Sequence, residues 1–246
     1  MSEDSTDNII PEKKNTLEKT RRRRISERLK ALRERSRLLE LELQNYTNSF
    51  FRVCIFGSAR IKPDDKNYTT TFELAKQLGE QGIDVLTGGG PGLMEAANKG
   101  VLAGKKEFGT GSRSFGLTIE LNKFESPSEH IDTKLHHRRF SSRLDDFMRL
   151  SHAVIVVHGG IGTVLELFFS WQLIQVGHMS ERPIILVGKE FWGPLIDWVR
   201  DYQVKQGLVS ESDIRWIHLV DTPEEAMVLI NKEHQRFLAA RKELQK

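Results

Sequence analysis

The sequence predicts an α/β fold, in which a doubly wound, Rossmann-like parallel sheet follows an N-terminal helical extension. From Phe51 onward, short β-branched runs alternate with helical stretches, a pattern typical of a parallel sheet covered on both faces. Three of these runs are followed by glycine-rich loops, and ligands gather at such loops in open α/β sheets. Residues 17–46 show the apolar spacing of an amphipathic helix instead.

The first 48 residues are predicted to form two segments. Residues 1–15 are polar, contain a proline and lack periodicity, so we expect a flexible tail there. Residues 16–48 are predicted to form a basic amphipathic helix with an apolar stripe made by Ile25, Leu29, Leu32, Leu39 and Leu43. The stripe is too short for an independent coiled coil, so we expect this helix to pack on the body or on a second subunit.

Residues 49–246 form the predicted Rossmann-like domain. Its predicted strands are short apolar runs at Arg52–Phe56, Asp84–Thr87, Phe115–Ile119, Ala153–Val157, Ile184–Val187 and Trp216–Val220. Its predicted helices lie at Thr70–Gln81, Leu93–Leu102, Thr133–Leu150, Thr163–Val176, Pro194–Gln206 and Pro223–Leu244. The last helix has the clearest start, because Thr222 can cap it, Pro223 suits its first position and Glu225 can complete a capping box.

The composition is that of a globular protein with one core. The 246 residues are 38% hydrophobic and 29% charged. Cys54 is the only cysteine and lies in an apolar run, so we expect a buried thiol, no intrachain disulfide and a reducing, cytoplasmic location. No uncharged apolar run approaches the roughly 20 residues that cross a bilayer, so we expect no membrane association.

The formal net charge of +3 is concentrated in the first fifty residues, around Arg21 to Arg24 and on to Arg37. This basic stretch can contact phosphates or acidic partners, or it can be a solvated helix face. No aromatic residues are interleaved for base stacking, which favours the solvated face, so a nucleic acid is not an expected partner.

The third glycine loop carries the strongest signal for a ligand. Residues 153–166, AVIVVHGGIGTVLE, are a predicted buried strand that ends in a glycine turn and passes directly into a helix. Backbone N–H groups at such a helix start can hold a phosphate, and the Thr163 hydroxyl is an extra donor. The loop fits neither GxxxxGK[ST] nor GxGxxG, which argues against triphosphates and dinucleotides.

Glu166 is an unusual carboxylate because its neighbours in the sequence are apolar. One interpretation is structural: Thr163 and Glu166 have the spacing of a capping box. The other is catalytic, because a carboxylate beside a bound sugar phosphate can stabilise an oxocarbenium-like transition state or activate a water molecule. The spacing alone favours neither, and the proximity of the phosphate loop favours the catalytic interpretation.

The predicted helix Thr133–Leu150 is rich in histidine and arginine. We expect most of these side chains to face solvent. His136 and His137 are adjacent, so on a helix their rings would point in different directions, and we expect no metal site there. The prediction therefore includes neither a metal nor an organic cofactor.

The glycine motifs resemble those of the Lonely Guy family of phosphoribohydrolases and, more closely, its bacterial relatives, the nucleotide 5'-monophosphate nucleosidases. The family motif PGGxGTxxE here reads HGGIGTVLE, with His158 in place of the proline. GGGPGLMEAANKG, at residues 88–100, and FGSAR, at residues 56–60, match the family's other two loops. The resemblance extends over residues 51–209.

The resemblance implies hydrolysis of the N-glycosidic bond of AMP or a related purine nucleotide to free base and ribose 5-phosphate. It implies that Arg143 and Glu166 are the catalytic pair. The implied nucleotide-binding residues are Gly57, Ser58, Gly89, Gly90, Gly92, Met94, His158, Gly159, Gly160, Gly162 and Thr163. Met94 can instead be a core residue. His158, in place of the motif proline, can change the rigidity of the loop or contact the ligand.

The position of the arginine follows from an ungapped count back from the glycines. That count selects Arg143, whereas the more familiar-looking LHHRR at residues 135–139 lies five residues too early. Arg143 keeps its proton at ordinary pH, so its expected role is to pair with Glu166 and orient the ligand.

Two further expectations come from the resemblance. The apolar stretch Trp171–Val176 is either core or part of a homodimer interface, and we expect a homodimer or a higher homo-oligomer. The alternative function is non-hydrolytic binding of a nucleotide or of the molybdenum cofactor, because carrier proteins for that cofactor share the expected fold.

Overall fold

The computed structural model describes residue 19 and residues 21–35, 49–119 and 128–244. The chain divides into two compact units, residues 1–49 and 50–246. In the first unit, residues 21–35 are helical, and Ile25, Leu29 and Leu32 are all exposed. The rest of the predicted apolar stripe, Leu39 and Leu43, and the predicted tail 1–15 lie outside the described residues.

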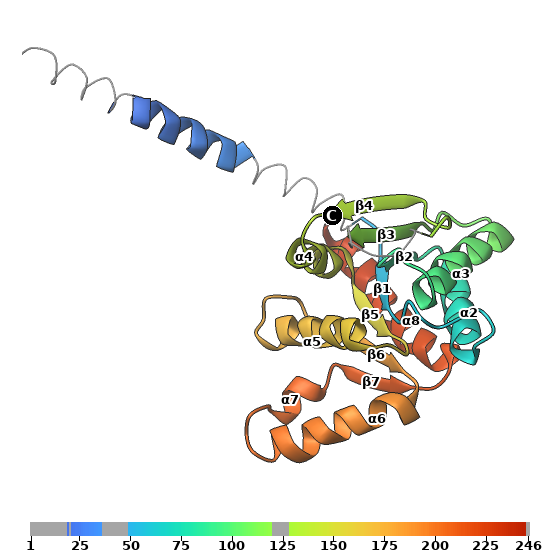
Figure 1. Ribbon diagram of the computed structural model, residues 1–246. Coiled ribbons are helices and arrows are strands. Elements are labelled where there is room, and N and C mark those ends of the chain that lie inside the picture. Colours follow the sequence, from blue (N-terminus) through green and yellow to red (C-terminus); the bar gives the residue numbers. More distant parts are fainter. Residues whose placement is uncertain (1–18, 20, 36–48, 120–127, 245–246) are drawn as a thin grey trace, which may run out of the picture. The chain divides into compact units, whose positions relative to one another are not determined.

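The second unit is built on one parallel sheet of seven strands (Figure 1). Its strands are β1 (Arg52–Phe56), β2 (Asp84–Thr87), β3 (Ser114–Ile119), β4 (Thr133–His137), β5 (Ala153–Val156), β6 (Ile184–Val187) and β7 (Ile217–Val220). Their order is β4-β3-β2-β1-β5-β6-β7, and every neighbouring pair is parallel. The structure thus confirms the predicted doubly wound α/β fold.

Helices cover both faces of the sheet. They are α2 (Lys66–Glu80), α3 (Leu93–Phe108), α4 (Phe140–Leu150), α5 (Ile161–Gln175), α6 (Lys189–Trp198), α7 (Glu211–Ile214) and α8 (Pro223–Leu244). One apolar core lies under α2, α3 and α8, and the other lies under α4, α5 and α6. Within the described residues, no helix is long and apolar enough to span a bilayer.

The strands are apolar throughout because both of their faces are covered. In β1, Val53 and Ile55 belong to one core, whereas Cys54 and Phe56 belong to the other. Cys54 is fully buried, as its apolar surroundings in the sequence predict. The strand order reverses between β1 and β5, and ligands of such sheets bind at this switch point, beyond the carboxyl ends of the strands.

The prediction of a single helix over Thr133–Leu150 is wrong in its first part. Residues 133–137 form the edge strand β4, and the helix α4 begins only at Phe140. Ile131, Leu135 and His137 alternate with more exposed residues, which is the two-residue period of a strand. His137 is therefore buried rather than solvent-facing.

Several helix boundaries also differ from the prediction, and α2 and α5 begin earlier, at Lys66 and Ile161. The helix α6 begins at Lys189, so Pro194 lies inside it, and a π-helical segment, Val199–Val204, follows it. The buried side chain of Trp192 anchors this early start, and the Asp221 carboxylate accepts the Lys189 N–H at 2.8 Å. The helix α3 continues to Phe108, and the short helix α7 was not predicted.

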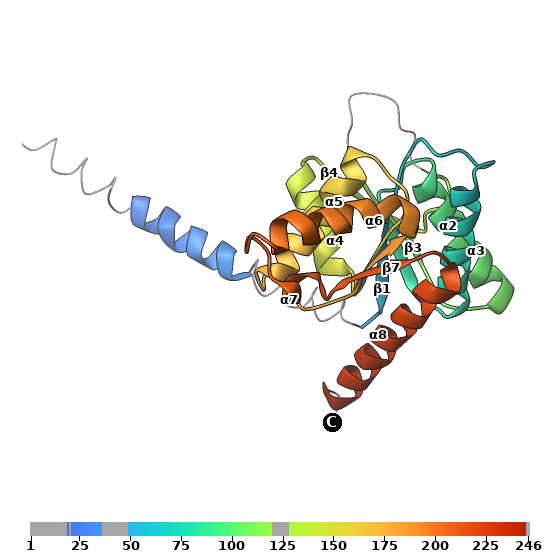
Figure 2. The same cartoon turned by 90° about the horizontal axis from the view of Figure 1, so that it is seen from below.

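The predicted start of α8 is correct. The Thr222 hydroxyl accepts the Glu225 N–H at 3.2 Å. The Glu225 carboxylate accepts the N–H of Asp221 at 2.7 Å, one residue before the expected partner. The first half of the helix packs on the sheet through Ala226, Met227 and Ile230, and its C-terminal end extends beyond the sheet (Figure 2).

Candidate functional site

The three glycine loops lie together at the carboxyl edge of the sheet. They follow β1, β2 and β5, which are neighbouring strands in the order β2-β1-β5. Ser58 connects them, because its N–H donates to the His158 carbonyl at 3.0 Å and its carbonyl accepts the Leu93 N–H at 2.9 Å. Residues from three separate stretches of sequence therefore form one continuous surface at the switch point.

Two glycines are required by the close approach of these loops. Gly92 has a φ of +68°, and a Cβ atom there would collide with the Ser58 carbonyl. A Cβ atom at Gly57 would collide with the Val157 side chain. The first loop can pack against the second and third loops only because both positions lack a side chain.

The second loop is held in place by a buried polar network. The Thr87 hydroxyl accepts the Gly89 N–H at 3.0 Å and donates to the Asn98 side chain at 2.9 Å. The Asn98 amide donates in turn to the Ser114 hydroxyl at 2.8 Å. Asn98 therefore supports the second loop through these hydrogen bonds. In the sequence, an amide side chain among the apolar residues of a helix was the sign of this role.

The third loop ends in a helix start that is open to an anion. The N-cap of α5 is Gly160, and no side chain caps the helix there. A Cβ atom at Gly160 or Gly162 would meet no atom within 4 Å, so there is open space around both. Thr163 is buried, with its side chain packed against Gly159. The first N–H groups of α5 are thus available to a phosphate.

Arg143 extends from α4 toward the same edge. Its Nε donates to the Leu117 carbonyl at 2.7 Å, and a terminal nitrogen donates to the Gly88 carbonyl at 3.3 Å. A Cβ atom at Gly88 would collide with this guanidinium group and displace it. Arg138 and Arg139, the alternative positions in the sequence, are exposed.

Met94 also contributes to the surroundings of Arg143. Its sulfur, like the guanidinium group, borders the space that a Cβ atom at Gly88 would occupy, and its side chain is only partly buried. The residue therefore lies at the mouth of the second loop, as a ligand-contacting side chain would.

Glu166 lies on α5 one turn after the open glycines, and it is not a cap. The helix begins at Ile161, so Thr163 is already its third residue and cannot be the N-cap of a capping box. Burial raises the pKa of Glu166 to about 7, although the nearby charge of Arg143 lowers it. Its carboxyl group therefore gains or loses a proton near neutral pH.

The charged side chains of Glu166 and Arg143 both lie close enough to the buried thiol of Cys54 to influence its pKa. Burial and the charge of Glu166 raise the pKa of Cys54, and the charge of Arg143 lowers it. Both charged groups therefore lie near the middle of β1, on the face of the sheet that α4 and α5 cover.

His158 stands where the family motif has proline, and its ring fills a space between two loops. It packs against Phe191 with ring centroids 4.5 Å apart, and a Cβ atom at Gly188 would collide with it. Burial lowers the pKa of His158, so the ring favours its neutral form. Its side chain thus joins the third loop to the start of α6, while its carbonyl holds Ser58.

The predicted site residues lie either at this edge or, for Arg143 and Glu166, beside it on the sheet face that α4 and α5 cover, and their roles stay a prediction. They are Gly57, Ser58, Gly89, Gly90, Gly92, Met94, Arg143, His158, Gly159, Gly160, Gly162, Thr163 and Glu166. Arg60 and Lys62 were not predicted, and they line an open cavity of about 430 Å³ beside the first loop.

Comparison with known proteins identifies the family. A family model described as "Possible lysine decarboxylase" matches residues 94–230, more than half of the chain. The chain belongs to this family. The match agrees with the resemblance of the glycine motifs to the Lonely Guy family.

Two curated relatives carry names of nucleotide-cleaving enzymes. The pyrimidine/purine nucleotide 5'-monophosphate nucleosidase of Escherichia coli (strain K12) is 29% identical over 129 residues, which are 51% of this family member and 28% of that enzyme. The present chain thus spans well under half of that relative. The cytokinin riboside 5'-monophosphate phosphoribohydrolase LOG of Oryza sativa subsp. japonica is 27% identical over 187 residues, 74% of each chain.

A solved structure shares the fold of this family member. The molybdenum cofactor carrier protein of Chlamydomonas reinhardtii superposes with a TM-score of 0.53 and 18% identity, over 76% of this chain and 99% of that chain. At this identity the likeness shows the fold alone.

Proposed function

We propose that this protein hydrolyses the N-glycosidic bond of a nucleoside 5'-monophosphate, AMP or a related purine nucleotide, to free base and ribose 5-phosphate. The observation that carries the proposal is the arrangement around the start of α5. An uncapped helix N-terminus with two open glycines lies one turn from Glu166, whose pKa is about 7 and which Arg143 influences electrostatically. The names of the two curated relatives support the same reaction class.

Each group has a distinct part in the proposed reaction. The 5'-phosphate binds the first N–H groups of α5, which present a positive dipole end to it. The ribose then lies along α5 toward Glu166, whose carboxylate stabilises positive charge at C1' and accepts a proton from the attacking water. The water oxygen bonds to C1', the C1'–N bond breaks, and its electron pair leaves with the base, which gains a proton.

Arg143 acts as a fixed positive charge. Its guanidinium keeps its proton at ordinary pH, so it orients groups rather than donating a proton. Its hydrogen bonds to the carbonyls of Leu117, within β3, and Gly88, just after β2, hold it in place. From this position it limits the rise in the pKa of Glu166 and keeps part of the carboxyl group ionised at neutral pH.

Release of base from a panel of nucleoside monophosphates tests the proposal. The full chain is incubated with AMP, GMP, CMP and UMP without added metal, and free base is quantified by chromatography. We expect purine release, reduced about 10²- to 10⁴-fold by Glu166→Gln and about 10²-fold or more by Arg143→Gln. Arg138→Gln is the matched control, because Arg138 is exposed just before α4, and it should retain full activity.

Thermal melting of each variant separates loss of chemistry from loss of fold. Full activity in both Glu166→Gln and Arg143→Gln would refute the site assignment. Tight binding of AMP without release of base from any nucleotide would refute hydrolysis and favour the carrier function instead.

A further inference from the structure

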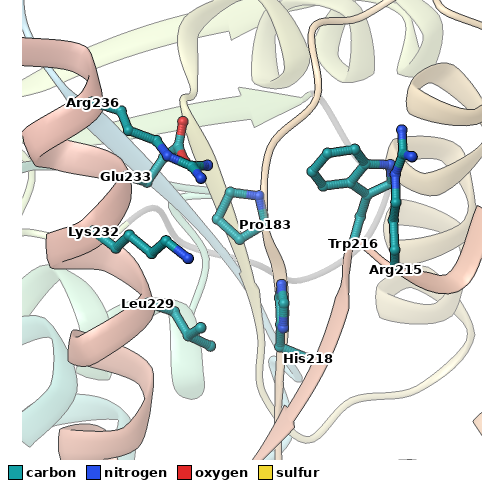
Figure 3. A pocket seen from close by; sticks show the side chains of 8 residues that line it. All are labelled: Pro183, Arg215, Trp216, His218, Leu229, Lys232, Glu233 and Arg236. Carbon is teal, nitrogen blue, oxygen red and sulfur yellow. The ribbon is translucent and has the colours of Figure 1, made fainter. Parts of the chain in front are cut away.

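A second cavity lies at the other edge of the sheet. It has a volume of about 160 Å³ and lies between α8 and the residues just before β6 and β7 (Figure 3). Pro183 directly precedes β6, and Trp216 directly precedes β7. These are the amino ends of parallel strands, so the cavity lies at the edge opposite the three glycine loops. Nothing in the proposed reaction uses it.

Positive charge dominates the lining of this cavity. Arg215, Lys232 and Arg236 contribute three cations, and Glu233 is the only acidic residue among its lining residues. Lys232, Glu233 and Arg236 extend from α8 toward Pro183, and Trp216 and Arg215 lie on the other side (Figure 3).

Two of the cations are already paired with carboxylates. Arg236 contacts Glu233 at 3.2 Å, and Arg215 is paired with Glu181 outside the cavity. Lys232 differs, because within the described residues it takes part in no ion pair. Its ammonium group lies near His218, since it contributes, after burial, to the lowered pKa of that half-buried histidine. An unpaired ammonium group therefore faces a neutral ring inside the cavity.

A neighbouring cavity adds to the same positive region. It has a volume of about 230 Å³ and shares Glu233 and Arg236 with the first. Arg182 lines it, and burial lowers the pKa of this arginine to about 10, whereas the nearby Glu233 carboxylate opposes that shift. Glu233 is thus balanced by two arginines, Arg182 and Arg236, and its charge does not neutralise Lys232.

The cavity also has a flat aromatic wall. The Arg215 guanidinium lies 4.5 Å from the centre of the Trp216 ring and holds the indole in place. Leu229 and Pro183 complete an apolar floor. A compact anion with an attached apolar or planar group fits these surroundings, because the charge and the ring have separate partners.

We propose that this cavity binds a phosphate-bearing small molecule, with the phosphate between Lys232 and Arg236 and the remainder of the ligand against Trp216. The same phosphate chemistry is present in inorganic phosphate, a sugar phosphate and a nucleoside monophosphate. The site is separate from the candidate active site, so occupancy of one does not block the other. The inference does not depend on the proposed hydrolase function.

The indole N–H resonances test this proposal directly. The chain has four tryptophans, so a ¹⁵N–¹H spectrum of the full chain contains few indole signals, and Trp216→Phe identifies that of Trp216. Inorganic phosphate, ribose 5-phosphate and AMP are titrated separately at constant ionic strength, with sodium chloride as the reference. We expect the Trp216 signal to shift saturably with phosphate-bearing probes, and the signal of Trp198, which lies on α6, to stay constant.

Substitution of the unpaired cation gives the second readout. Lys232→Gln should weaken the apparent affinity at Trp216 about tenfold or more, because it removes a charge-assisted contact. Lys242→Gln, an equally exposed lysine at the end of α8 and outside the cavity, should leave the affinity unchanged. The relative affinities of the three probes identify the preferred ligand. A Trp216 signal that follows chloride equally well, or that titrates identically in Lys232→Gln, would overturn the proposal.

Discussion

At the scale of single residues, Glu166 shows how burial adapts a carboxyl group to neutral pH. An exposed glutamate is almost fully ionised at pH 7. The apolar neighbours of Glu166 on α5 remove water from its carboxyl group and raise its pKa to about 7. Arg143 opposes this rise, so the two residues together set the protonation state of the site.

The pH dependence of catalysis should report this balance. The carboxylate is the form that can accept a proton, so kcat/KM for AMP should fall as the pH decreases through about 7. Arg143→Gln removes the charge that favours ionisation, and it should move the midpoint of the remaining activity to higher pH. The pH profiles of both proteins can be measured by initial rates of base release. A midpoint near the ordinary pKa of glutamate, or an unchanged midpoint in Arg143→Gln, would contradict this role.

At the scale of elements, the start of α5 combines two functions in one short turn. Gly159 is required by the packing of Thr163, whereas Gly160 and Gly162 have no neighbouring atoms that would exclude a side chain. Gly160 is the N-cap, where glycine is favourable, but Gly162 lies inside α5, where glycine costs stability because alanine has the higher helix propensity. The open glycines are therefore best explained by a ligand that lies against them.

Gly162→Ala tests this explanation. The added methyl group should leave the thermal midpoint unchanged or raise it, consistent with a gain of up to about 1 kcal/mol from helix propensity. It should raise KM for AMP several-fold, because it occupies the space of the phosphate. Gly193→Ala is the matched control, because Gly193 lies in α6 with nothing within 4 Å of its added Cβ atom. Equal KM values in the two variants would show that no phosphate binds at Gly162.

The sequence predicted elements well where one physical signal dominated. Buried strands such as β1, β2 and β6 match their predicted bounds, because continuous apolar runs flanked by turn residues have few other interpretations. The edge strand β4 was missed because its histidines and lysine resemble a solvated helix, and pairing with β3 overrides that local composition. The early start of α6 was missed because a buried tryptophan outweighed the boundary signal of Pro194.

The sequence predicts which residues form the candidate site, and their roles stay a prediction, whereas the groups that hold them in place are visible only in the fold. The spacing of the glycines and Glu166 is local, so the motif alone predicts it. The partners of Arg143 are backbone carbonyls of β2 and β3, and any residue type can supply a carbonyl. The contact of His158 with Gly188 and Phe191 joins loops thirty residues apart, and only the fold shows it.

The homo-oligomer expected from the family remains a prediction. Of the apolar stretch Trp171–Val176, Trp171 and Ile174 are buried in the core.

At the scale of the whole molecule, the parallel sheet places two candidate ligand-binding regions at its opposite edges. The carboxyl edge gathers three glycine loops, Arg143 and Glu166 at the switch point, whereas the amino edge holds the basic cavity beneath α8. A ligand at the carboxyl edge meets helix N-termini and loop N–H groups, and a ligand at the amino edge meets long cationic side chains. At the carboxyl edge, we propose that the nucleotide lies across the loops after β1 and β5 with its ribose against Glu166.

A crystal structure of Glu166→Gln with AMP tests this claim most directly, because the variant should bind the nucleotide without cleaving it. We predict the 5'-phosphate within hydrogen-bonding distance of the N–H groups at the start of α5, and C1' facing the side chain at position 166. A phosphate bound elsewhere, with the ribose directed away from Glu166, would contradict the account.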